Sequence, residues 1–293
     1  MKIRRICCTL SLLLGLPLVS TGTGLPVHRA EAAAVAQAHD HHDLAVSLRQ
    51  LVQQDDAQYS VYVDFLDGSR PLLFQNQQVR SASMIKVFIL ATAMEEEAAG
   101  QLDENHELVL RDDMKVGGAG SLCGWADGSH ITIKQLLYKM ITESDNTATN
   151  MLIDYLGMGR INQYIQQHGY TQTKLQRKMM DTEAVQEGRE NLTSARDLGI
   201  FFSRLYHKQC VSPSLDQKMI DILLDQEDTD VLPAACPGSR VAHKTGELDH
   251  LYHDGGIVYG PDHDRVIVIL TENQDDADLT LKLMKEIAAK ADR

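Results

Sequence analysis

The sequence predicts an α/β (α+β) fold in which both ends of the chain form one antiparallel sheet flanked by helices, with an all-helical subdomain between them. Apolar residues alternate with a period of two at 58–66, and short apolar runs bounded by turn residues follow residue 239. Between these regions the apolar residues recur with a helical period. We expect a single folded unit over 44–293, divided into a sheet subdomain (44–82 with 228–293) and a helical subdomain (83–227).

Residues 1–38 are predicted to be a signal peptide, with an approximate boundary. Three basic residues, Lys2, Arg4 and Arg5, precede an apolar stretch at 6–19 that is too short for a stable membrane span. Small residues suited to cleavage follow it. We therefore expect export to the periplasm or the extracellular space.

The chain is acidic, with 28 Lys plus Arg against 41 Asp plus Glu and a formal net charge of −13. Loss of the basic leader makes the remaining chain more acidic still. This charge argues against nucleic acid and anionic membrane surfaces as partners.

Three cysteines remain after the predicted leader: Cys123, Cys210 and Cys236. In an exported protein a pair can oxidise, and we favour a disulfide between Cys210 and Cys236, which leaves one thiol over. The alternative is three buried free thiols.

The first predicted element of the sheet is a β-hairpin. Apolar side chains alternate along QYSVYVDFL (58–66), Asp67-Gly68 is a turn dipeptide, and PLLF (71–74) supplies the second strand.

The next segment, MIKVFILATAM (84–94), is apolar on nearly every face, which predicts a helix buried on all sides. Its single charged residue is Lys86. A lysine in such a helix must either extend its amine to water or lose its proton.

The middle of the chain is predicted to be helical. Thr132 and Gln135 form a capping box for a helix that begins at 133. Further helices are expected at 146–156, 159–168, 193–207 and 213–225. The last part returns to strands at SRVAHKT (239–245), GGIVYG (255–260) and RVIVILT (265–271), followed by a helix at 276–290.

Ser83 and Lys86 are the first candidates for chemistry. Helical spacing places residues three apart on one face, so the lysine amine lies beside the serine hydroxyl. Apolar surroundings lower a lysine pKa, and a neutral amine can accept the serine's proton. The structural alternative is a serine N-cap with a lysine that reaches the surface.

Two further motifs follow in order: Ser144-Asp145-Asn146 after a strongly periodic helix, and Lys244-Thr245-Gly246 within a predicted strand. Each is weak alone, but the ordered set in an exported α/β chain is specific. Over roughly 44–290 the chain resembles the penicillin-recognising serine acyl-enzymes, and most closely the class A β-lactamases.

The resemblance implies a β-lactam hydrolase that confers β-lactam resistance, acts as a monomer and needs no metal or organic cofactor. Its substrate would be a small-molecule β-lactam or a peptidoglycan-like compound. Ser83 would be the acylated nucleophile, Lys86 its proton partner and Ser144 a proton relay. Asn146, Lys244, Thr245 and Gly246 would bind substrate, and the backbone N–H groups of Ser83 and Glu247 would form the oxyanion hole.

One part of the family pattern is missing. Class A enzymes release the acyl group with a glutamate in the pattern Glu-x-x-Leu-Asn, which this chain lacks. If Arg177 takes the place of the loop's structural arginine, Met179 falls where the glutamate should be. We therefore expect one of four acids to replace it and prefer Glu183. The other three are Asp181, Glu187 and Glu190; alternatively, all four are solvated surface carboxylates.

No arginine follows Lys244-Thr245-Gly246 to reinforce carboxylate binding, so His250 or His253 is a candidate for that role, with a structural role as the alternative. We interpret Asp145 as a helix cap, His243 as a packing residue and Trp125 as a core or surface residue.

Two other functions remain open. The first is a D,D-peptidase or esterase-like serine hydrolase acting on cell-wall peptides, which the missing glutamate favours. The second is a penicillin-binding or sensor module that acylates without turnover.

Overall fold

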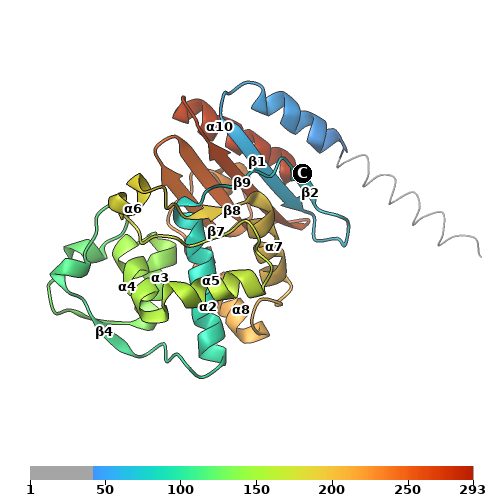
Figure 1. Ribbon diagram of the computed structural model, residues 1–293. Coiled ribbons are helices and arrows are strands. Elements are labelled where there is room, and N and C mark those ends of the chain that lie inside the picture. Colours follow the sequence, from blue (N-terminus) through green and yellow to red (C-terminus); the bar gives the residue numbers. More distant parts are fainter. Residues whose placement is uncertain (1–41, 293) are drawn as a thin grey trace, which may run out of the picture. The chain divides into compact units, whose positions relative to one another are not determined.

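The computed structural model describes residues 42–292, so the predicted signal peptide lies outside the described residues (Figure 1). A five-stranded sheet has the order β2-β1-β9-β8-β7, and every neighbouring pair is antiparallel. Its strands are β1 (Gln58–Asp64), β2 (Leu72–Phe74), β7 (Arg240–Leu248), β8 (Leu251–Tyr259) and β9 (Asp264–Glu272). The first two strands and the last three therefore meet in one sheet, as the sequence predicts.

The predicted helices are present with ends shifted by a few residues. They are α2 (Lys86–Ala98), α3 (Ile133–Thr142), α4 (Asn146–Leu156), α5 (Met158–Gln167), α7 (Ala195–Tyr206), α8 (Pro213–Leu224) and α10 (Ala277–Ala291). A further helix spans 42–52. The capping box of Thr132 and Gln135 is formed at the start of α3. No helix within 42–292 has the length and apolar character needed to cross a bilayer.

Several short elements have no signal in the sequence. They are α6 (Thr182–Gln186), α9 (Leu232–Ala235) and two small sheets that pair β3 (Val79–Arg80) with β6 (Leu192–Thr193) and β4 (Glu107–Val109) with β5 (His130–Thr132). Each strand of these two sheets spans only two or three residues, so tertiary contacts rather than local pattern determine it.

The sheet separates two hydrophobic layers, because successive residues of a strand point to opposite faces. On β9, Val266, Val268 and Leu270 pack into the helical layer, whereas Ile267 and Ile269 pack on the other side. Helix 42–52 and α10 cover that second side, and α7 and α2 belong to the helical layer (Figure 1).

The predicted Cys210–Cys236 disulfide is wrong. Both thiols are free and buried, Cys210 in the helical layer and Cys236 in the layer beneath α10, so the sheet keeps them apart. Burial raises the pKa of Cys236 to about 12 and the pKa of Cys210 above its ordinary value. Cys123 is free and exposed, so the alternative of three buried thiols is also wrong.

The serine–lysine segment begins in a 3₁₀ turn, η1 (Ala82–Ile85), and continues as α2. Residues 86–94 are all buried, as the apolar pattern predicts. Ser83 lies within the turn, whose N-cap residue is Ser81, so Ser83 is not the cap. Its hydroxyl contacts the Lys86 amine instead.

Candidate active site

The three sequence motifs meet around one pocket of about 880 Å³. Strand β7 is the edge strand of the sheet and packs against η1. A Cβ on Gly246 would lie 3.2 Å from the backbone nitrogen of Ser83, so a glycine here lets the strand approach the nucleophile closely. Ser83, Ser144, Asn146, Thr245, Gly246 and Glu247 all line the pocket.

The Lys86 amine is at the centre of the polar contacts. Its Nζ lies 2.9 Å from Ser83 Oγ, 2.6 Å from the carbonyl oxygen of Ser144 and 3.0 Å from Asn146 Oδ1. The residue is fully buried, so it does not reach the surface. Burial, reinforced by the charge of Lys244, holds the pKa of Lys86 well below its usual value, while Asp145 acts in the opposite direction.

The hydrogen-bond acceptors around Lys86 determine where the N–H groups and the lone pair of a neutral amine would point. The carbonyl of Ser144 and Oδ1 of Asn146 can only accept, so they take both N–H groups of a neutral amine. The lone pair is then left for a hydroxyl, and Ser83 Oγ is within reach. The arrangement therefore suits proton transfer from Ser83 to Lys86.

Ser144 connects the two buried lysines. Its Oγ lies 3.1 Å from the Nζ of Lys86 and 3.1 Å from the Nζ of Lys244. Ser144 adopts a φ of 54°, a left-handed conformation that is costly for a residue other than glycine and recurs at functional sites. Burial lowers the pKa of Lys244 to about 7, although Asp228 and Asp254 act in the opposite direction.

The pH dependence of acylation should reflect both lysines. Below the lowered pKa of Lys86 the amine is protonated and cannot accept the serine's proton, so the rate should fall. Above about pH 7 Lys244 loses its charge and its hold on a substrate carboxylate, so the rate should fall again. When the acylation rate is measured by intact mass over a range of pH values, its dependence on pH should be bell-shaped.

The control for this prediction is Lys244→Arg, which keeps its charge and should move the alkaline limb upward. A wild-type rate that climbs steadily to pH 10 would show instead that Lys86 keeps an ordinary lysine pKa near 10.4.

Asp145 is a helix cap, as predicted. Its Oδ1 accepts from the backbone N–H of Ala148 at the start of α4, and its Oδ2 accepts from Leu122 N–H. The first bond caps α4, and the second holds the loop that carries Ser144 against the loop that carries Leu122.

The sequence did not lead us to predict the glycine-rich loop at 117–120, which contacts Ser144-Asp145-Asn146. Asn146 Nδ2 donates to the carbonyl of Gly117 at 3.1 Å. Gly120 has a φ of 100°, and a Cβ there would lie 2.2 Å from the Asp145 carboxylate. The glycine-rich GGAG at 117–120 was the available signal.

The loop at 173–197 places Met179 on the pocket wall. Asn150 holds its backbone by two hydrogen bonds, accepting from Met179 N–H at 2.7 Å and donating to its carbonyl at 3.0 Å. Arg177 is paired with Glu190, Nε to Oε1 at 2.8 Å. Sequence reasoning also missed Asn150, which lies on α4 one turn after Asn146.

The structure does not bring Glu183 to the site. Glu183 and Glu187 are exposed and do not line the pocket. Asp181 and Glu190 do line it, but Asp181 caps α6 by accepting from Ala184 N–H, and Glu190 is held by Arg177.

We therefore expect Glu183→Gln to leave the lifetime of an acyl adduct unchanged, because the side chain is exposed and does not line the pocket. Time-resolved intact mass after removal of free penicillin would measure it. Glu187→Gln, equally exposed on the same loop, is the matched control. A longer-lived adduct in the Glu183 variant alone would restore Glu183 as the base for deacylation.

Neither histidine after the third motif lines the pocket. His253 is buried and lies 2.8 Å from the carbonyl of Arg80, while His250 contacts the carbonyl of Gln274. Burial lowers the pKa of His253. His243 is buried and bonded to Asp254 at 2.8 Å, a packing role as predicted. Trp125 packs at the edge of the core and lies outside the pocket lining.

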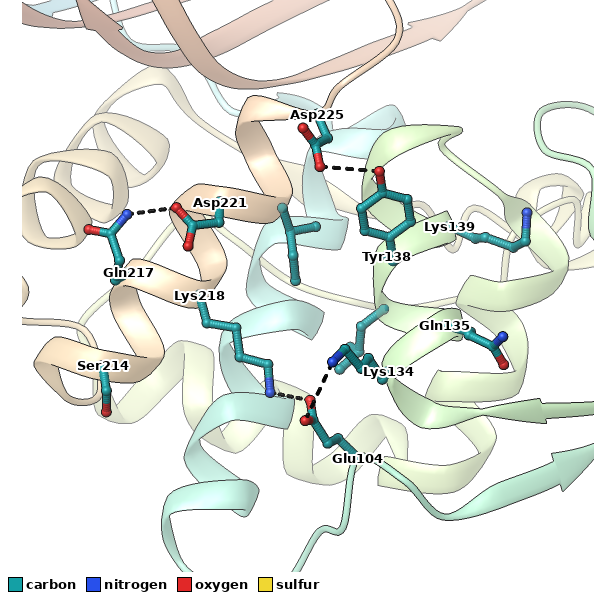
Figure 2. Close-up of a pocket in the computed structure, with 12 residues that line it drawn as sticks. Glu104, Lys134, Gln135, Tyr138, Lys139, Ser214, Gln217, Lys218, Asp221 and Asp225 are labelled. Atoms are coloured by element: carbon teal, nitrogen blue, oxygen red, sulfur yellow. Dashed lines mark hydrogen bonds and ion pairs between the residues drawn. The ribbon is translucent and has the colours of Figure 1, made fainter.

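A second cavity of about 610 Å³ lies between α3 and α8, away from the nucleophile (Figure 2). Its polar side chains are largely paired: Tyr138 donates to Asp225 at 3.1 Å, and Lys218 is bonded to Glu104. Across residues 42–292, no group of three or more His, Cys, Asp or Glu is placed to hold a metal ion.

Known proteins are similar to this chain over most of its length. The sequence model of the beta-lactamase enzyme family matches residues 43–292. A beta-lactamase of Streptomyces fradiae is 25% identical over 293 residues, which cover 92% of this chain and 93% of the relative.

Solved structures give the same result. The crystal structure of a beta-lactamase from Sphaerobacter thermophilus DSM 20745 is 26% identical, with a TM-score of 0.79, and the match covers 85% of this chain and 95% of that chain. A variant of PBP-A, solved as an acyl-enzyme complex with penicillin G, is 28% identical with a TM-score of 0.79 over 86% and 95% of the two chains. The family match confirms the predicted resemblance to β-lactamases. An ancestral class A beta-lactamase structure, 21% identical with a TM-score of 0.78, confirms the predicted fold.

Proposed function

Because this chain belongs to the beta-lactamase enzyme family, we propose that it opens the amide bond of β-lactams through an acyl-enzyme formed on Ser83. The observation that carries the proposal is the contact of 2.9 Å between Ser83 Oγ and the Nζ of a fully buried lysine. A buried amine with a lowered pKa is the base that a serine nucleophile needs.

In the proposed acylation, Ser83 Oγ bonds to the lactam carbonyl carbon as its proton passes to Lys86. The oxyanion is stabilised by the backbone N–H groups of Ser83 and Glu247. When the tetrahedral adduct collapses, the carbon–nitrogen bond breaks and the nitrogen takes up a proton through Ser144, which lies within reach of both lysines. Water must then cleave the ester to restore the free serine.

The test is intact-mass spectrometry of the protein with excess penicillin G while the free drug is followed. We expect one adduct per chain that forms quickly and clears slowly, with more than one equivalent of drug consumed. A protein that never gains the mass of the drug would contradict the proposal.

A second candidate is a D,D-peptidase or esterase-like activity on cell-wall peptides. The observation that favours it is that Met179 lines the pocket. If Arg177 takes the place of the structural arginine of class A enzymes, a glutamate would be expected at this position. Without that base the release of a penicilloyl group is slow, which matters less for a peptidase. Cleavage of a peptide that ends in D-alanyl-D-alanine, faster than turnover of penicillin G, would support this candidate.

The sequence of residues 1–38 supports export of the enzyme to the periplasm or the extracellular space. The proposed contribution to β-lactam resistance depends on turnover there. Expression in a sensitive host, with and without residues 1–38, would test both points together through the penicillin concentration that the host survives.

A further inference from the structure

We propose that the active-site pocket selects substrates that carry a carboxylate at one end and a protonated amine on the acyl side, with Glu247 and Asp249 recognising the amine. This inference rests on the proposed function and names its preferred substrate class. The charges that line the pocket and their order along β7 support it.

One end of the pocket has the groups needed to bind an anion. Thr245 is 94% buried and lines the pocket, and its hydroxyl has no hydrogen-bond partner within residues 42–292. Next to it, the Lys244 amine bonds to Ser144 and to the carbonyl of Thr245. A free hydroxyl beside a buried lysine suits a substrate carboxylate.

The rest of the lining is strongly negative. Two arginines and seven carboxylates line the pocket. Both arginines are already paired, Arg80 with Glu272 and Arg177 with Glu190. The lining therefore holds more negative charge than these arginines can neutralise, and a positive group on a substrate would be attracted to it.

Several of the seven carboxylates are engaged within the protein. Glu143 is paired with Lys139, and Asp228 accepts from Tyr252 Oη. In contrast, Glu247 and Asp249 are exposed, and their side-chain oxygens have no partner among the residues that the structure describes. They are free to bind a ligand.

The order of these groups along β7 determines which end of a bound ligand should be negative and which should be positive. Glu247 follows Thr245 by two residues, which is about 7 Å along an extended strand. Asp249 comes next in the turn that leads to β8. Because Thr245 and Glu247 are two residues apart, their side chains point to the same face of the strand. A ligand lying along this face of β7 thus meets the Thr245 hydroxyl, next to the Lys244 amine, first and the Glu247 carboxylate about 7 Å later.

The experiment compares three penicillins that share one nucleus: ampicillin with a protonated amine, neutral penicillin G, and carbenicillin with an added carboxylate. Second-order rates of Ser83 acylation are measured by intact mass at about pH 6, below the usual α-amino pKa. We expect ampicillin to react about three- to tenfold faster than penicillin G, and carbenicillin to react more slowly than either. About 1 M salt should reduce the differences.

The double variant Glu247→Gln with Asp249→Asn should bring the ampicillin to penicillin G ratio close to one. Asp262→Asn, an exposed carboxylate in the turn at the other end of β8, is the matched control and should keep the wild-type ratio. Equal rates for the three drugs, or a ratio that survives the double variant, would overturn this inference alone. Absence of any adduct with all three would overturn it together with the proposed function.

Discussion

Replacement of Ser83 by alanine is expected to abolish the acyl adduct with penicillin G. The hydroxyl lies 2.9 Å from the Lys86 amine and lines the reactive pocket, and within residues 42–292 only Ser144 shares these two features. Ser144, which also contacts Lys86, contributes a hydroxyl to the pocket but is shared between two lysines and suits relay rather than attack. Loss of a serine nucleophile costs roughly 10⁶-fold in rate in a well-studied serine hydrolase, so intact mass should show no adduct even after hours.

The matched control is Ser81→Ala. Ser81 is two residues earlier and buried, its hydroxyl contacts only the neighbouring carbonyl of Ala82, and it does not line the pocket. This variant should acylate like the wild type. A melting temperature close to that of the wild type would show that Ser83→Ala still folds. An adduct on folded Ser83→Ala would move the nucleophile to another residue, Ser144 first, and would refute the central assignment.

The reactive residues were predictable because each is carried by a short local motif. The spacing of Ser83 and Lys86 fixes their contact once the segment is helical, and burial of Lys86 follows from the apolar run around it. The strands and long helices were predictable for the same reason, since their apolar periods extend over many residues. The hairpin, the capping box at Thr132 and the three C-terminal strands are the clearest cases.

The position of Glu183 was not predictable in this way, because it depends on the path of a loop. Asn150 holds Met179 from a different helix, and Arg177 pairs with Glu190 thirteen residues later. These contacts direct Met179 into the pocket and leave Glu183 exposed on α6. No periodic pattern in the loop reveals which side chain faces the serine. The cysteine pair failed for a similar reason, since only the sheet determines that Cys210 and Cys236 lie in different layers.

Met179→Glu is expected to have the second large effect, which is on the release of the acyl group. Met179 is 7% exposed, lines the same pocket as Ser83 and has its backbone fixed by Asn150, so a glutamate there would be held facing the acyl-enzyme. A carboxylate in this place can take a proton from water as the water attacks the ester. General-base catalysis of this kind contributes about 10²- to 10⁴-fold. We therefore expect the adduct to clear faster by a factor in that range while the rate of acylation changes little.

The matched control for this variant is Met179→Gln. A glutamine side chain is nearly as large and as polar as a glutamate side chain but cannot accept a proton from water at neutral pH. If the base is what the wild-type pocket lacks, the glutamate variant should turn penicillin G over repeatedly, and the glutamine variant should keep the slow wild-type release. Release that is equally fast in both variants would mean that space for water, rather than a base, was limiting. An adduct of unchanged lifetime in Met179→Glu would mean that the carboxylate does not reach the water, and that the methionine does not occupy the place of the missing glutamate.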